Sequence, residues 1–500
     1  MLSLIVFLPL AAAAVLALPR RLPDRVARWS WLLVTVLDLA LVVIVAARYR
    51  TPEDTAAGVG GLAFEERLRW IPSVNSSYHL GVDGLSLPLL GLTAVVFCAC
   101  AVHALHEERR PRAQAALFLF LQSVCLGAFV AQDLILFFVF FDLSIVGMYF
   151  AIAGWGHGNA DRSALKFFLY TFLGSLALLV GFIGLFLAAD PHTFDIPELA
   201  AAMPLAGSPL VGGLVLAAVL VGLAVKTPTV PFHTWLPPAH TDASAVGSAV
   251  LAAILLKLGT YGFVRIAMPL LPDAWQAWSW VIIIVGVVSV LYGALVALAQ
   301  TNVKRMIAYT SVNHMGYVVL AVGAAGLVGS GERARELAVT GAVTQMVSHG
   351  LITAALFLLA GVLQDRSGTY EMGEYGGLAK PAPRFAGLFA VAAFASLGLP
   401  AFSGFIAEFQ IFTGSIGATW VAALALPGIL ITAALFLRAI QRLLTGPTVG
   451  RSVGFTDVRV HEALPIGGLL VLSLLIGVVP GPLLDLITEG SQTVIGLVSR

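Results

Sequence analysis

Charged residues are scarce in this chain of 500 residues, because Asp, Glu, Lys and Arg together make up only 11% of it. Hydrophobic residues make up 59%, and the mean hydropathy is +0.95. A soluble globular protein carries about twice this share of charge, so the composition excludes that class. The formal net charge of +1 also gives no reason to expect a nucleic-acid partner.

Cysteine and cofactor-binding motifs are equally sparse. Only Cys98, Cys100 and Cys125 are present, all within apolar runs, where they are expected to pack as small hydrophobic side chains. They indicate neither a disulfide framework nor a metal site. The sequence contains no CxxC pair for an iron–sulfur cluster, no GxGxxG after a strand and no P-loop. We therefore expect no NADH, flavin, cluster or other cofactor on this chain.

Long hydrophobic runs occupy most of the sequence. A membrane-spanning helix needs roughly 20 apolar residues. About fourteen runs qualify: 2–18, 28–47, 84–106, 113–131, 134–154, 164–188, 210–239, 243–270, 276–300, 305–327, 336–363, 385–415, 418–441 and 463–486. The fold class predicted is an all-α polytopic membrane protein with about 14 transmembrane helices.

The basic residues predict how this bundle is oriented. The first run has no basic stretch before it and is followed by Arg20 and Arg21, which favours a first membrane helix over a cleaved leader. Loops on the same side as these two hold most of the Lys and Arg, including Arg109, Arg110 and Lys304. By the positive-inside rule this side is cytoplasmic, and both termini lie outside the cytoplasm.

Among the ionisable residues inside the apolar runs, six are the most informative, because a charge there costs several kcal/mol unless a partner or water compensates for it. They are Asp142, Lys226, Lys257, His314, His349 and Glu408. Such residues mark ion pathways more often than static ion pairs, although a single histidine can simply bond to a neighbouring helix.

A proton relay is the function that these residue types favour. An opposite charge stabilises the charged form of a buried lysine, so Asp142 keeps Lys226 protonated while the two are close. Withdrawal of the carboxylate favours release of the proton to the next carrier. We therefore expect Lys226, Lys257, the two histidines and Glu408 to pass protons through intervening waters.

Two of the runs are interrupted by helix breakers. One contains Lys226 and Pro228 to Pro238, and the other contains Leu399, Pro400, Ser403 and Gly404 just before Glu408. Broken membrane helices are tolerated only where they line a polar cavity. The segments VPFHTW and SGFIAE are weakly similar, as are GMYFAIAG and GYVVLAVG. This similarity predicts two inverted five-helix repeats, helices 4–8 and 9–13.

The repeats predict the domain limits. Residues 1–112 hold helices 1–3, and residues 113–270 form the first repeat. Residues 271–415 and 418–441 form the second repeat, and residues 442–500 hold helix 14.

The chain resembles the antiporter-like membrane subunits of bacterial respiratory complex I, the proton-translocating NADH:quinone oxidoreductase. The resemblance rests on Asp142 to Gly156, KTPTVPFHTWLPPAHTDASAVGSAVLAAILLKLGTYG, QTNVKRMIAYTSVNHMGY and LGLPAFSGFIAEF, and it covers nearly the whole chain. The M-type subunits are most similar, because GVDGLSLPLL looks like their entry to the third helix and Glu408 stands where the L and N types carry lysine. The chain also ends after the predicted helix 14, which leaves no length for the lateral helix of the L type.

The resemblance implies a proton-channel axis of Asp142, Lys226, Lys257, His314, His349 and Glu408, with Lys166 as a lesser candidate at a helix entrance. Two positions depart from the family pattern. Asp142 stands where glutamate is usual, so its pair with Lys226 is expected to be longer or bridged by water. Asn302 replaces a common loop aspartate.

The resemblance further implies the setting. The chain is expected to be a non-redox subunit of an oxidoreductase in the bacterial inner membrane. Its expected partners are neighbouring antiporter-like subunits, the lipid bilayer, protons and internal water. Redox energy would reach it from other subunits. The alternatives are a subunit of a multi-subunit sodium/proton antiporter, a membrane-bound hydrogenase subunit and a purely structural scaffold. The scaffold alternative leaves the central lysines unexplained.

Other ionisable residues are less decisive. For Asp38, a contact to a neighbouring subunit and a local hydrogen bond are equally favoured roles. His103 and Asp133 are expected to be structural. His233, His240 and Asp242 either order the break or guard a proton entrance.

Overall fold

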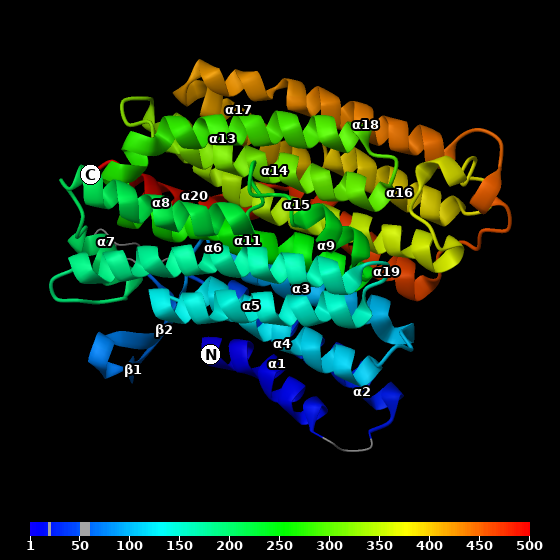
Figure 1. Ribbon diagram of the computed structural model, residues 1–500, viewed down its shortest axis with the longest axis horizontal. Helices are drawn as coiled ribbons and strands as arrows, with labels where there is room; N and C mark the ends of the chain where they lie inside the picture. Colours follow the sequence, from blue (N-terminus) through cyan, green and yellow to red (C-terminus); the bar gives the residue numbers. More distant parts are fainter. Residues whose placement is uncertain (19–21, 51–60) are drawn as a thin grey trace.

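The computed structural model describes residues 1–18, 22–50 and 61–500. Arg20 and Arg21, counted above in the charge distribution, lie outside these ranges. The described residues form a helical bundle whose long helices run in one common direction, horizontal in Figure 1. Helices dominate because a chain in lipid must satisfy every backbone N–H and C=O within its own segment.

Eleven helices of the described residues are long and apolar enough to cross a membrane. The helices before the first break are α1 (Leu2–Ala17), α2 (Asp24–Arg48), α3 (Leu87–His103), α4 (Pro111–Val130), α5 (Leu134–Trp155), α6 (Ala160–Ala188), α7 (Ile196–Ala202) and α8 (Pro209–Lys226). Those from there to the second break are α9 (Leu236–Asp242), α10 (Ala245–Val250), α11 (Leu256–Gly262), α12 (Met268–Leu270), α13 (Pro272–Ala299), α14 (Val303–Ala325), α15 (Glu332–Ser367) and α16 (Pro383–Ser396). The remainder are α17 (Ser403–Ala418), α18 (Pro427–Leu444), α19 (Val460–Val478) and α20 (Gly481–Val498).

The expected helical membrane fold is confirmed as the predominant structure, whereas the count of fourteen spans, the two repeats and the domain limits stay predictions. One boundary was wrong. The run 463–486 is divided by Pro480, so that α19 ends at Val478 and a further 18-residue helix, α20, follows. The chain therefore does not end with the predicted fourteenth helix. Composition missed this division because residues 463–486 are mostly apolar, with Asp485 as their one charged residue, whereas the break occurs at Pro480.

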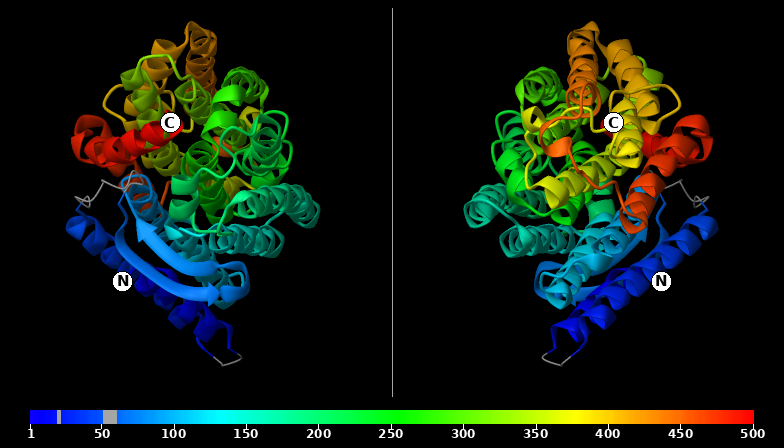
Figure 2. Two further views of the ribbon diagram at one scale, coloured as in Figure 1. Left: turned by 90° about the vertical axis from the view of Figure 1, so that its left-hand side faces the viewer. Right: turned by 90° about the vertical axis from the view of Figure 1, so that its right-hand side faces the viewer.

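A two-stranded antiparallel hairpin lies at one end of the bundle, and the sequence reading did not predict it. Strand β1 (Ala63–Ile71) pairs with β2 (Ser76–Val82) through a turn at Asn75. Figure 2 shows the hairpin beside the N-terminal helices in the end-on view. Both chain ends lie toward the same end of the bundle as the hairpin (Figure 1). This placement agrees with an even number of membrane crossings.

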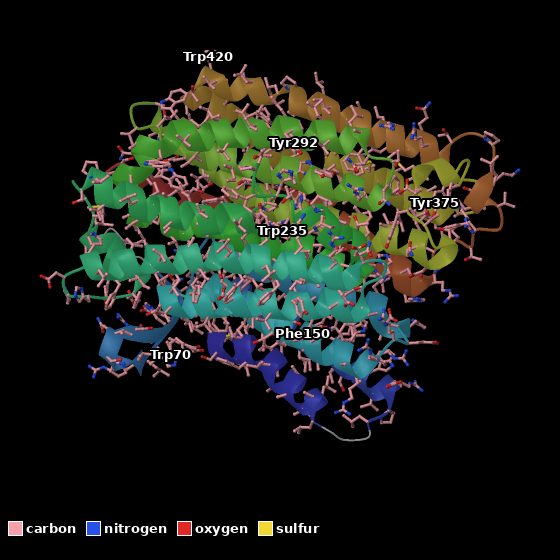
Figure 3. All side chains as sticks on the ribbon, viewed as in Figure 1. Trp70, Phe150, Trp235, Tyr292, Tyr375 and Trp420 are labelled. Carbon is pink, nitrogen blue, oxygen red and sulfur yellow. The ribbon has the colours of Figure 1, made fainter. Side chains whose placement is uncertain are left out.

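Both predicted helix breaks are present. Helix α8 ends at Lys226, and α9 begins ten residues later at Leu236. Trp235 is fully buried in this break and donates from Nε1 to the Val225 carbonyl at 2.9 Å, and Figure 3 shows it at the centre of the bundle. The second break separates α16 from α17 between Ser396 and Ser403.

Helix α15 forms the centre of the bundle. It is 36 residues long, and its most apolar stretch is entirely buried. Helix α14 packs beside it, and α13 packs on α14 with the backbones of these two helices in close approach. A Cβ added to Gly293 would lie 2.6 Å from the Asn313 nitrogen, and one added to Gly316 would lie 2.7 Å from the Val290 nitrogen. Small residues permit such approach between membrane helices, and it brings polar side chains of several helices together.

Candidate functional site

Lys226 is buried at the C-terminal end of α8, with 1% of its surface exposed. Its ammonium group lies where the negative end of the helix dipole stabilises a cation. Nζ donates a hydrogen bond to Ser144 Oγ at 3.1 Å and lies 4.9 Å from the centre of the Phe141 ring. A hydroxyl and an aromatic face, both from α5, therefore hold the cation.

Asp142 lies on the same helix but does not contact Lys226 directly. Its Oδ1 atom is buried without a hydrogen-bond partner, and its carboxyl group lies beside Ser175 of α6. Asp142 acts on Lys226 through space, and the expectation that the pair is longer or bridged by water stays a prediction. Ser144, two residues after Asp142, is instead the direct hydrogen-bond partner of Lys226. Sequence reasoning missed Ser144, because a serine in a membrane helix gives no signal by itself.

Lys257 is completely buried at the middle of the bundle. It lies on α11, between the π-helical segments η4 (Leu251–Leu255) and η5 (Phe263–Ala267). Nζ donates to the Ala252 carbonyl at 2.7 Å and lies 2.6 Å from His349 Nδ1. The wider π turn frees carbonyl groups from the regular ladder, and such turns occur frequently at functional sites. The local helix distortion thus supplies one of the two partners of the ammonium group.

His349 connects Lys257 to the second half of the chain. It lies on α15, and its other ring nitrogen, Nε2, lies 3.2 Å from Ser311 Oγ of α14. With the ammonium donating to Nδ1, the neutral imidazole carries its proton on Nε2. The ring can therefore accept a proton on one side and release one on the other.

Glu408 and His314 form the far end of the site. Glu408 Oε1 lies 3.9 Å from His314 Nε2, and the His314 ring centre lies 5.4 Å from that of His349. A cavity with a volume of about 10 Å³ lies among these three side chains, with Ser348 also in its wall. This is roughly the volume that one water molecule requires, and the polar walls provide partners for it.

Gly398 positions Glu408 from the second break. Its φ angle is +77°, and a Cβ atom there would lie 2.7 Å from Glu408 Oε2. Any other side chain would meet both an unfavourable backbone conformation and the carboxylate.

The two halves of the buried axis, defined as Asp142, Lys226, Lys257, His314, His349 and Glu408, meet at Thr227. A Cβ added to Gly259, two residues beyond Lys257, would lie 2.4 Å from Thr227 Oγ1. The Thr227 hydroxyl is buried without a hydrogen-bond partner. The helix end that carries Lys226 thus touches the helix that carries Lys257, and an unpaired hydroxyl lies at their contact.

Lys166 is not part of this axis. It lies in the first turns of α6 with an exposed side chain, and its charge acts on His233 in the first break. Its expected place near a helix entrance agrees with α6, which begins at Ala160.

Lys304 was assigned to a loop, although it is the second residue of α14 and fully buried. Nζ donates to the Ala243 carbonyl and to Tyr370 Oη at 3.3 Å. Tyr370 Oη also lies 2.9 Å from His157 Nε2. Burial, together with the charge of Lys304, lowers the pKa of His157 in its loop, so the imidazole is neutral. Burial raises the pKa of Tyr370, so the hydroxyl keeps its proton.

Three of the remaining residues from the sequence analysis have structural partners. Asp38 accepts a hydrogen bond from Gln122 Nε2 at 2.5 Å, which is the local alternative. Asp133 caps α5 by accepting from the backbone of Ile135 and Leu136. Asn302 caps α14, and its Nδ2 donates to Glu371 Oε1 at 3.0 Å.

His233 and His240 are buried and His103 at the end of α3 is half-buried, and each has ring nitrogens that lack a hydrogen-bond partner among the described residues. These are His103 Nδ1, His233 Nδ1 and both ring nitrogens of His240.

Comparison with known proteins places this geometry in a family. Residues 131–435 match the family model described as NADH:quinone oxidoreductase/Mrp antiporter, transmembrane. The chain is 39% identical to NADH-quinone oxidoreductase subunit M of Rhodobacter capsulatus, over 97% of this chain and 94% of that one. It is 38% identical to F(420)H(2) dehydrogenase subunit M of Methanosarcina mazei, over 88% of each.

Solved structures agree with these relatives. A chain of respiratory complex I from Thermus thermophilus superimposes with a TM-score of 0.88 at 29% identity, over 100% of both chains. A chain of the Mrp complex from Dietzia shares the fold, with a TM-score of 0.85 at 23% identity, over 100% of this chain and 99% of that one. The chain therefore belongs to the NADH:quinone oxidoreductase/Mrp antiporter transmembrane family.

Proposed function

We propose that this chain is a proton-translocating membrane subunit of a redox-driven complex, of the M type found in NADH:quinone oxidoreductase. The observation that carries the proposal is the buried contact from Lys257 to His349, which continues to a water-sized cavity shared with His314 and Glu408. Titratable groups in direct contact within a membrane protein are costly, and proton relays are the function that uses them.

The contacts set the proton steps that the side chains can perform. Lys257 donates from Nζ to His349 Nδ1, and His349 releases its Nε2 proton toward Ser311 or the cavity. The cavity has room for one water, which would connect His349 and His314 to the carboxylate of Glu408. At the other end, Asp142 sets the charge state of Lys226 from a distance while Ser144 holds its ammonium group. Redox chemistry belongs to other subunits, and this chain supplies only the proton path.

The setting follows from the same assignment. The chain is a multi-pass membrane protein, and we assign it to the bacterial inner membrane with both termini outside the cytoplasm. Its partners are other antiporter-like membrane subunits.

Substitution of Lys226 and of Asp142 tests the proposal. In the assembled complex, Lys226→Ala and Asp142→Ala should each abolish or greatly reduce proton pumping and the coupled quinone reduction. Unchanged pumping stoichiometry in both variants would show that the relay is wrong. Ser279→Ala is a matched control, because Ser279 is buried and bonded only to the carbonyl of its own helix at Trp275.

A second candidate function has the same proton path in a complex that uses a different electron donor. The relative from Methanosarcina mazei, named as a subunit of an F(420)H(2) dehydrogenase, is nearly as similar as the bacterial one. Neighbouring reading frames distinguish the two, because they encode either NADH-binding or F420-binding subunits. Small antiporter subunits in their place would instead support the sodium/proton antiporter, which the acidic Glu408 disfavours.

A further inference from the structure

A groove of about 720 Å³ lies between α1 and α4, at the end of the bundle where α1 finishes and α4 begins. This volume is in the range of ligand sites, about 300–1,000 Å³. One wall comes from Leu10, Ala13, Ala14, Leu16 and Ala17, and the other from Ala113, Ala116, Leu117 and Phe120. The groove is thus apolar along its length, and it is remote from the buried axis.

The sequence explains why the two helices leave this space. Residues 11–14 of α1 are four consecutive alanines. Their short side chains do not fill the space toward α4 that larger side chains would occupy. Ala14 is exposed, and the neighbouring Val15 is 53% exposed. Exposed apolar side chains on a membrane helix face lipid, and a lipid chain is the natural occupant of an apolar groove there.

The end of the groove is basic. Arg110 and Arg112 line it, and the Nε atom of Arg112 donates to the Leu16 carbonyl at 2.6 Å, which fixes this guanidinium between the two helices. Arg110 lies over the Trp155 ring at 5.6 Å and donates to the Gly154 carbonyl at 3.2 Å. The exposed Asp24 also lines this end and is the one carboxylate among the described lining residues.

The N-terminus of α4 points toward the same end. No side chain caps this helix, and its first residue is Pro111, which has no N–H group. The next backbone N–H groups are free of helix partners, and helix N-termini attract phosphate oxygens. The arginine side chains and the helix end thus place positive charge at one membrane boundary, at the mouth of an apolar groove.

We propose that this groove binds an anionic phospholipid. The phosphate lies at Arg110, Arg112 and the start of α4, and one acyl chain lies between α1 and α4. Charge complementarity selects an anionic lipid, because basic pockets between membrane helices at the cytoplasmic face bind such headgroups. The positive-inside assignment puts this end of the bundle at that face. The binding does not depend on proton transfer.

Photo-crosslinking in the assembled complex tests the site. The complex is reconstituted into vesicles that contain phosphatidylglycerol with a photoreactive acyl chain, or phosphatidylcholine with the same chain. Mass spectrometry then measures labelling of residues 10–17 and 113–120. We expect phosphatidylglycerol to label these segments about 25-fold more, since Arg110 and Arg112 each contribute about fivefold.

Three variants separate the contributions. The double variant Arg110→Gln/Arg112→Gln should reduce the preference to near one, whereas Arg25→Gln, which removes an exposed arginine outside the groove, should preserve it. Ala14→Phe fills the groove and should remove labelling by both lipids. Equal labelling by the two lipids in the native complex would overturn the proposal, because it shows only general lipid contact. Absence of labelling by either would also overturn it, by showing that another subunit covers the groove.

Discussion

Lys257 Nζ and His349 Nδ1 lie 2.6 Å apart, although the two residues are 92 positions apart in the chain. The first belongs to the helix that follows the first break, and the second to the central helix of the other half. This contact makes one continuous site out of two sets of helices that carry ionisable residues.

Removal of the imidazole should interrupt this site. In His349→Leu, Lys257 retains only the Ala252 carbonyl and has no proton acceptor. We expect pumping in inverted membrane vesicles to fall about 10²-fold, the usual contribution of a positioned proton carrier. Ser311→Ala, which removes only the partner of Nε2, should have a smaller effect. Full pumping in His349→Leu would exclude the histidine from the path.

Ser144→Ala tests the direct partner of Lys226. Hydrogen bonds to charged groups contribute about 1.5–3 kcal/mol, so loss of the 3.1 Å contact should slow pumping by about tenfold or more. The complex should still assemble, because Ser144 is small and its hydroxyl otherwise bonds only to the Phe141 carbonyl of its own helix. The pumping rate per assembled complex provides the measurement. A rate equal to that of the Ser279→Ala control would show that the contact is dispensable.

Asp142→Glu should be tolerated. The Asp142 carboxylate acts on Lys226 electrostatically without touching it, and the added methylene of glutamate would bring the carboxylate closer to the ammonium group. We expect pumping at or above the native rate, whereas Asp142→Asn should be severely impaired because it removes the charge. The comparison is made in the same vesicles with the same donor. An inactive Asp142→Glu variant would show that the shorter side chain is required.

Gly398→Ala should damage the second break. A methyl group would lie 2.7 Å from Glu408 Oε2, and the positive φ angle adds about 1–2 kcal/mol of strain. We expect a lower thermal transition of the complex together with impaired pumping. Gly387→Ala on α16 provides the control, since nothing lies within 4 Å of its added Cβ. Equal behaviour of the two variants would argue against this role of Gly398.

The sequence alone determined the membrane class, most helix positions, both breaks and the six residues of the buried axis. It did so because lipid imposes a strong local rule: an apolar run of sufficient length becomes a helix, and a charge within it is costly enough to stand out. The same rule failed where the signal was not local. Lys304 stands next to Arg305 in a polar stretch, so the local pattern did not indicate that its side chain is buried. Pro480 lies within a mostly apolar run, so the start of α20 was not predicted.

Only the tertiary structure decided which side chains touch. Ser144, rather than Asp142, holds Lys226, because the rotation of α5 and the end point of α8 place the hydroxyl and not the carboxylate at Nζ. Likewise His349 meets Lys257 because α15 passes through the centre of the bundle beside the π-helical turn. Contacts between distant helices depend on helix rotation and close packing, which arise from the whole bundle and from no single segment of the chain.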